Sequence, residues 1–154
     1  MWARFNYFIG AWRGAGRGKA GPSRVERRYE FVLNSKFLFV RSTLIYDPQE
    51  THRNDPIHED WGFISYHRAR ETYMFRQFHS EGFVNDYVLN ELTEEEQAVS
   101  FVTEAIENLP PGWRARQTCR ILGPEEFLEN FEMAGPDKEF RLYTETHFQR
   151  VRSE

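Results

Sequence analysis

The chain has little cysteine, no long apolar run and no large excess of charge of one sign. Its single cysteine, Cys119, cannot form an internal disulfide, which is typical of a reducing compartment, so we expect a cytoplasmic protein. No stretch resembles a signal peptide, and no apolar run approaches the roughly 20 residues of a membrane helix, so we expect no membrane partner. The net charge of −4 is spread along the chain and leaves no basic stripe for nucleic acid.

Several familiar catalytic patterns are also missing from the sequence. Phosphate-loop, Rossmann and nucleophile-elbow motifs are absent, and no predicted helix follows the glycines of residues 14–18. Arg116 and Arg120 flank Cys119 and could lower the pKa of its thiol. No histidine lies near Cys119 in the sequence, however, so a small buried residue is the favoured interpretation. We therefore assign no catalytic residue.

What the chain does have is an opening stretch in which glycine recurs at every second position. In a strand, alternate residues share a face, so Trp12, Gly14, Gly16 and Gly18 would line one side. Interior glycine marks a bend or a close approach by backbone or ligand. A Gly-rich loop after a helix is the competing interpretation. We favour a first strand of a small closed barrel, plugged at one end by Trp12.

Short strand-like runs then repeat about every dozen residues, and aromatic residues make up 16% of the chain. With a short helical turn before Gly10, they predict an all-β fold, in which residues 1–154 form a single ten-stranded antiparallel up-and-down β-barrel. Closure removes the two open edges that a ten-stranded meander would leave. Ten strands leave more interior room than eight, so we expect a ligand cavity. After the opening strand, the predicted strands are 24–33, 37–46, 58–67, 72–79, 83–92, 98–106, 113–122, 126–133 and 139–152.

Two histidines and an aspartate are candidates for a polar site at one mouth of this barrel. His58 and Asp60 share a strand face, and His79 reaches the same mouth if the fourth and fifth strands pair. An imidazole beside a carboxylate forms an oriented base or part of a metal site. No pair has a diagnostic metal-ligand spacing, so we predict no metal. His52, in a polar loop over 47–57, and His67, in a turn, are expected to be solvated.

Arginines could orient an acidic ligand. Arg41 and Arg76 sit in otherwise aromatic strands, and Arg141 and Tyr143 could cradle a carboxylate through charge-assisted hydrogen bonds. Cross-strand salt pairs on an outer face are the competing interpretation. Trp12 should also pack against Arg150 or Arg152 of the last strand. The predicted lining residues are Trp12, Arg41, His58, Asp60, Arg76, His79 and Tyr143.

Several stretches resemble known barrel families. Residues 8–16, Phe37-Leu38 and residues 56–63 resemble the nitrobindin family and related calycin-like barrels, and Gly10-x-Trp12 resembles the lipocalin signature. Residues 61–66 and 105–113 are similar to a group of bacterial lipocalin-like proteins of unknown function. These resemblances imply a ten-stranded barrel of calycin type.

The nitrobindin resemblance also implies haem as an alternative cofactor. Ile57 and His58 match the family's distal pocket pair, and His79 falls where a pocket glutamine lies. The family's axial histidine falls near Tyr143, and His147 lies on the same strand parity, so either could replace it. Haem binding therefore stays an alternative, with no cofactor as the main expectation.

The sequence thus predicts binding of a small hydrophobic ligand, with or without an acidic group, inside a lipocalin-like barrel. Two alternatives remain: a haem protein, and an isomerase or cyclase that uses His58 with Asp60 as its base. Exposed apolar residues leave a homodimer open.

Overall fold

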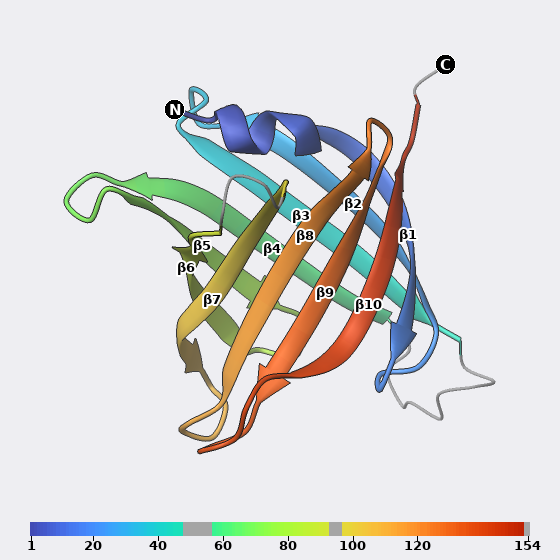
Figure 1. Ribbon diagram of the computed structural model, residues 1–154, viewed down its shortest axis with the longest axis vertical. Coiled ribbons are helices and arrows are strands. Elements are labelled where there is room, and N and C mark those ends of the chain that lie inside the picture. The colour runs from blue at the N-terminus through green and yellow to red at the C-terminus, as the bar shows by residue number, and fades with distance from the viewer. Residues whose placement is uncertain (48–56, 93–96, 153–154) are drawn as a thin grey trace.

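The computed structural model describes residues 1–47, 57–92 and 97–152. A short 3₁₀ helix, η1 (Ala3–Phe8), is followed by ten strands (Figure 1). The strands are β1 (Gly10–Gly18), β2 (Ser23–Val32), β3 (Phe37–Tyr46), β4 (Ile57–His67), β5 (Thr72–His79), β6 (Val84–Asn90), β7 (Ala98–Glu107), β8 (Arg114–Gly123), β9 (Glu126–Ala134) and β10 (Arg141–Arg150).

All ten strands pair antiparallel with their sequence neighbours, and β1 also pairs with β10, which closes the barrel. The predicted ten-stranded barrel is therefore confirmed, and β2–β10 begin and end within two residues of the predicted bounds. Most of the predicted loop over 47–57, including His52, and of the predicted acidic turn over 93–97 lies outside the described residues. Within the described part of the chain, no helix is both long and apolar enough to span a bilayer.

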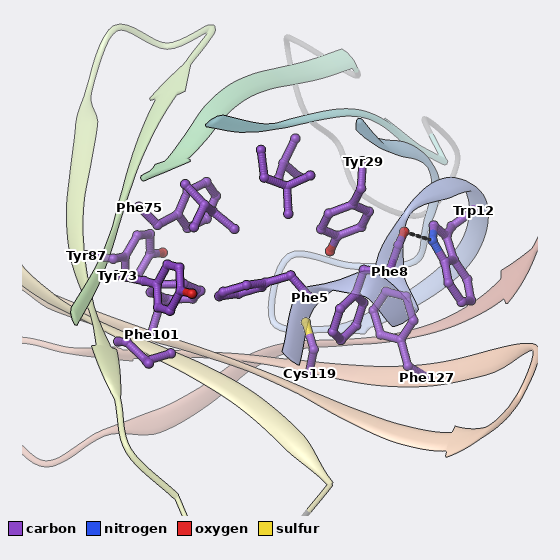
Figure 2. Packing of buried hydrophobic residues seen from close by; sticks show 14 of the residues in the cluster. Phe5, Phe8, Trp12, Tyr29, Tyr73, Phe75, Tyr87, Phe101, Cys119 and Phe127 are labelled. Atoms are coloured by element: carbon purple, nitrogen blue, oxygen red, sulfur yellow. Dashed lines mark hydrogen bonds between the residues drawn. The ribbon is translucent and has the colours of Figure 1, made fainter. Parts of the chain in front are cut away.

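The helix η1 lies across one end of the barrel (Figure 1), where its aromatic side chains pack with Trp12 of β1 (Figure 2). Phe5, Phe8 and Trp12 are each almost fully buried, and the Trp12 indole N–H donates to the Phe8 carbonyl oxygen at 2.7 Å. The Arg150 guanidinium lies over the Trp12 ring, 4.2 Å from its centroid, and donates to the Ile9 carbonyl oxygen. The predicted helical turn and the predicted contact between Trp12 and a last-strand arginine are both confirmed.

The inward glycines of β1 make room for neighbouring side chains. A Cβ atom at Gly14 would lie 2.7 Å from Thr146 Cγ2 and 2.8 Å from the Phe148 ring. Both are closer than carbon atoms can approach without displacement, so glycine allows β10 to pack against β1 here. The expected close approach is therefore made by side chains of the barrel itself.

Strand register lines up inward-facing polar residues on four adjacent strands. Arg27 pairs with Ser42, Ser42 with Asp60, and Asp60 with His79. Since paired residues point to the same face of a sheet, these side chains form one row across the inner wall. We call these four residues the polar row.

The polar row separates two kinds of interior. Towards η1 the wall is aromatic, since Tyr66 and Tyr73 pack against each other and Tyr73 packs against Phe5. On the other side of Asp60 along β4 comes His58, whose imidazole faces His79. The barrel is therefore apolar at its capped end and polar towards its other end.

Arg27 is buried and forms an ion pair with Glu129 of β9. Its Nη1 donates to Glu129 Oε2, and its Nη2 donates to Oε1 at 3.2 Å. Its Nε donates to Ser42 Oγ at 2.7 Å, and Gln117 Nε2 donates to the same carboxylate at 2.8 Å. A charge held this far from water needs such partners, because an unpaired buried charge is strongly destabilising.

We expect Glu129→Gln to lower the free energy of unfolding by about 3–5 kcal/mol, because it leaves the Arg27 charge buried without a counterion. Replacing both partners, as Arg27→Met with Glu129→Leu, should recover most of that loss. Urea unfolding monitored by tryptophan fluorescence measures both values.

The matched control changes Glu132, which lies on β9 like Glu129 but belongs to a partly exposed ion pair with Arg116. Glu132→Gln should cost less than about 1 kcal/mol. Equal losses at positions 129 and 132 would contradict the role given to the buried pair.

Candidate functional site

At one end of the polar row, the structure brings His58 together with two members of the row, Asp60 and His79. His58 Nε2 lies 3.3 Å from Asp60 Oδ2 and 3.2 Å from His79 Nδ1. Asp60 is 5% exposed, and Gln77 Nε2 donates to its Oδ1 at 2.9 Å. The alternation of β4 and its pairing with β5 produce this arrangement.

A fourth member of the site, Glu81, is absent from the predicted lining residues. Its Oε2 lies 2.6 Å from His58 Nδ1, and it comes from the turn between β5 and β6. That turn is fixed by the Ser80 N–H, which donates to the Glu59 carbonyl oxygen at 2.8 Å. The available signal was the position of Glu81 directly after the strand that carries His79.

The two imidazoles have opposite pKa shifts. Burial tends to lower the pKa of His58, but hydrogen bonds to Asp60 and Glu81 outweigh it, so the net shift is upward. Burial lowers the pKa of His79 to about 4. Although burial tends to raise the pKa of Asp60, the hydrogen bond with His58 and the charge of Arg27 lower it overall.

These shifts favour one arrangement of protons. When His58 is protonated, it donates from Nδ1 to Glu81 and from Nε2 towards Asp60 and His79, and a neutral His79 accepts at Nδ1. Both ring nitrogens of His58 then face protein acceptors. To act as the base of an isomerase or cyclase, His58 would have to lose a proton and break its contact with Glu81, or its contacts with Asp60 and His79.

The other predicted lining residues lie elsewhere. Arg41 is exposed on the outer face of β3. Its neighbours Val40 and Ser42 are buried inside the barrel, and adjacent residues of a strand face opposite sides. Arg76 is also on the outer face, where it pairs with Asp86 and Glu107, each at 2.9 Å. The expected interior position of both arginines is therefore corrected.

Trp12 and Tyr143 also lie apart from the histidines. Trp12 belongs to the plug at the capped end, where its ring packs 4.7 Å from that of Phe127. Tyr143 is left unpaired at a β-bulge between Leu142 and Thr144, and its ring packs edge-on against Phe131. A bulge changes which residues of the strand face inward, so simple alternation along the sequence does not give the direction of Tyr143.

The interior arginine is instead Arg27, which the predicted lining residues omit. It has the same strand parity as Val25 and Tyr29, so its inward direction could have been inferred. Cys119 is buried, as predicted, and burial together with the nearby Glu129 charge raises the pKa of its thiol. A buried thiol of high pKa is a poor nucleophile.

A small cavity lies under η1 at the aromatic end. Its volume is about 30 Å³, and its lining includes Phe5, Phe8, Tyr29, Phe75, Gln117 and Cys119. A single water needs roughly 10–15 Å³ on the same measure, so this space holds only a small group. Figure 2 shows why, since aromatic rings from η1 and the strands converge in the interior.

The residues considered for haem do not fit that group. His147 lies between the inward-facing Thr146 and Phe148, so it points outward, where its Nε2 is 2.7 Å from Glu126 Oε2. Tyr143 packs at the bulge, and the cavity of about 30 Å³ is far too small for a porphyrin. We derive no chemistry through haem.

Comparisons with known proteins define the class of fold. The crystal structure of Rv2717c from M. tuberculosis matches with a TM-score of 0.72 and 16% identity, over 98% of this chain and 97% of that one. An S-type phycobiliprotein lyase, CPES from Guillardia theta, matches with a TM-score of 0.58 and 10% identity, over 97% and 92%. No family model and no curated protein matches the sequence. The chain has the fold of the calycin-like, or lipocalin-like, barrels.

The opposite pKa shifts predict an opposite pH dependence for the two histidines. His79 should stay neutral until the pH falls to about 4, whereas His58 should still carry its proton above pH 6.5. Because unfolded His79 takes up a proton near pH 6.5, its contribution to stability is present above that pH and is lost as the pH falls towards about 4. Ring nitrogen NMR across this range measures both pKa values.

Two variants separate these contributions. Glu81→Gln should lower the pKa of His58, because it removes one of the carboxylates that stabilise the imidazolium. His79→Gln should lose less stability than the wild type between pH 7 and pH 4.5 in urea unfolding. A His79 that titrates at the same pH as His58 would contradict the proton arrangement.

Proposed function

We propose that this protein binds a small, largely apolar molecule inside its barrel, beneath η1. The aromatic cavity under Phe5 and Phe8 carries the proposal, because ligand sites are concave and mostly apolar with a few polar groups. Gln117 supplies such a polar group on the cavity wall. The calycin-like barrel supports a binding role in general, and the single buried Cys119 is the ground for placing that role in the cytoplasm.

The two halves of η1 are anchored differently, which suggests how a larger molecule enters. At its C-terminal end, the Tyr7 hydroxyl donates to the Gly123 carbonyl oxygen at 2.7 Å, and Trp12 and Arg150 hold the neighbouring carbonyls. At its N-terminal end, the Tyr73 hydroxyl donates to the Met1 carbonyl oxygen, Phe5 packs on the Tyr73 ring, and Arg4 pairs with Glu91 at the surface. The Phe5 ring itself makes only apolar contacts, so we take it as the part of the plug that moves to admit a ligand.

Movement of Phe5 would join two spaces. A recess of about 370 Å³ at the barrel end is lined by Tyr73, among others, and Phe5 lines the inner cavity. The rings of Phe5 and Tyr73 touch, with centroids 4.9 Å apart, and so separate the two. Displacing Phe5 extends the site towards the few hundred Å³ that small-molecule pockets have.

The proposed ligand needs no acidic group. Arg27, the inward arginine, is already paired with Glu129, and Arg41 and Arg76 face outward. A free carboxylate would have to compete with Glu129 for Arg27. A neutral molecule with one hydrogen-bonding group, able to reach Gln117, fits these charges better.

Binding is tested by titrating the protein with an uncharged fluorescent apolar probe, N-phenyl-1-naphthylamine, and by displacing it with uncharged alcohols of increasing chain length. Phe5→Leu should tighten probe binding about tenfold, because it shortens the side chain that closes the cavity. Val40 also lines the cavity, so Val40→Phe should weaken binding at least about tenfold, because the added ring fills that space.

The matched control is Phe39→Leu, since Phe39 lies next to Val40 on β3 but faces Trp61 and Phe63 on the outer surface. It should leave binding unchanged. If Val40→Phe binds the probe as the wild type does and Phe39→Leu does not, the probe sits on the outer face and the proposal fails.

A further inference from the structure

The cluster of His58, His79 and Glu81 has the composition of a metal site. Each of the three side chains offers one ligand atom, and these atoms all lie within 4.8 Å of one another. Among the described residues, this is the group of histidine, cysteine and carboxylate side chains that meets this condition. Two imidazoles and one carboxylate form a common ligand set for zinc and other first-row transition ions.

The spacing of the two imidazoles matches a shared ion. His58 Nε2 and His79 Nδ1 are 3.2 Å apart. Two nitrogens bound to one tetrahedral ion at 2.0–2.1 Å would be about 3.3 Å apart. An ion can therefore replace the hydrogen bond between these nitrogens with little change in the position of either ring. Glu81 Oε2 now contacts the other ring nitrogen of His58, Nδ1, at 2.6 Å, so its exposed side chain has to turn towards His58 Nε2 to bind the same ion.

The fold holds the ligands in place before any ion arrives. The His79 ring stacks on Phe83, with centroids 4.0 Å apart and planes at 17°. The turn that carries Glu81 is closed by the Gly82 N–H, which donates to the His79 carbonyl oxygen at 2.8 Å. A site built in this way loses little conformational entropy on binding.

Asp60 places a second carboxylate beside the nitrogen of His58 that would bind the ion. It lies 3.3 Å from His58 Nε2 and is itself held by Gln77. Because the same Nε2 would bind the ion, Asp60 would lie beside the ion, where its negative charge attracts a cation and its removal should weaken metal binding. The carboxylates also balance the charge of a divalent ion, while Glu81, whose side chain is 46% exposed, leaves the site open to water ligands.

We propose that His58, His79 and Glu81 bind one divalent first-row transition metal ion, with zinc as the ion best matched by the ligand set and spacing. The site includes His79, the last member of the polar row, shares no residue with the lining of the aromatic cavity, and does not depend on the ligand proposed for that cavity. The ion would join β4 to the end of β5 and to the turn that follows it.

The experiment is calorimetric titration of tag-free, EDTA-treated and desalted protein with ZnCl₂ at pH 7.5. We expect one ion per chain, and we expect CoCl₂ to give the intense visible absorption of a tetrahedral cobalt site. His58→Gln and His79→Gln should each weaken zinc binding roughly 100-fold or more, and Asp60→Asn roughly 10- to 100-fold. Glu81→Gln, in an exposed turn, should weaken binding without loss of fold.

The matched controls are the other two described histidines, His67 and His147, both exposed. His67→Gln and His147→Gln should bind zinc as the wild type does, and so should Val40→Phe. Thermal unfolding in EDTA confirms that each variant is folded. Wild-type binding weaker than millimolar, or unchanged binding in the folded His58→Gln and His79→Gln variants, would overturn the proposal.

Discussion

The ion pair between Arg27 and Glu129 is the interaction on which the interior depends. It joins β2 to β9 through the inside of the barrel, and its charges are held by Ser42 and Gln117. A buried pair of this kind adds little net stability over apolar packing, but its members cannot be separated cheaply. It therefore fixes where the aromatic packing ends and where the polar region begins.

The same constraint shapes the electrostatics of the histidine cluster. Because Arg27 is neutralised by Glu129, the negative charge of Asp60 has to be balanced mainly by His58. That balance raises the pKa of His58, while burial lowers the pKa of His79 to about 4. A cluster with two carboxylates and one removable proton is suited to cations and poorly suited to an acidic ligand.

Much of the fold could be predicted because its signals are local. Strict alternation in β2, tight turns, and glycine at every second position of β1 each act over a few residues, so the strand bounds come close to the observed ones. His58 and Asp60 were found for the same reason, since two residues of one strand face share a direction whatever the rest of the chain does. The contact between Trp12 and Arg150 could be predicted because closure of the barrel places the first strand beside the last.

What could not be predicted depends on contacts between distant residues. β3 is apolar on both faces, because Phe39 packs outside against Trp61 and Phe63, so its sequence does not show that Arg41 points outward. No local pattern links Arg27 to Glu129 or Glu81 to His58, since the partners lie on different elements. The size of the cavity depends on how many aromatic rings from η1 enter it, and composition alone does not show this.

The pairing of β1 with β10 has a consequence for folding during synthesis on the ribosome. Every other pairing joins strands that follow one another, so each hairpin can form as soon as its second strand leaves the ribosome. One edge of β1 has no partner until the last strand has been synthesised. During that interval, the free edge of β1 could pair with a strand of another chain. The glycines of β1 and the charges of Arg13 and Arg17 disfavour such pairing.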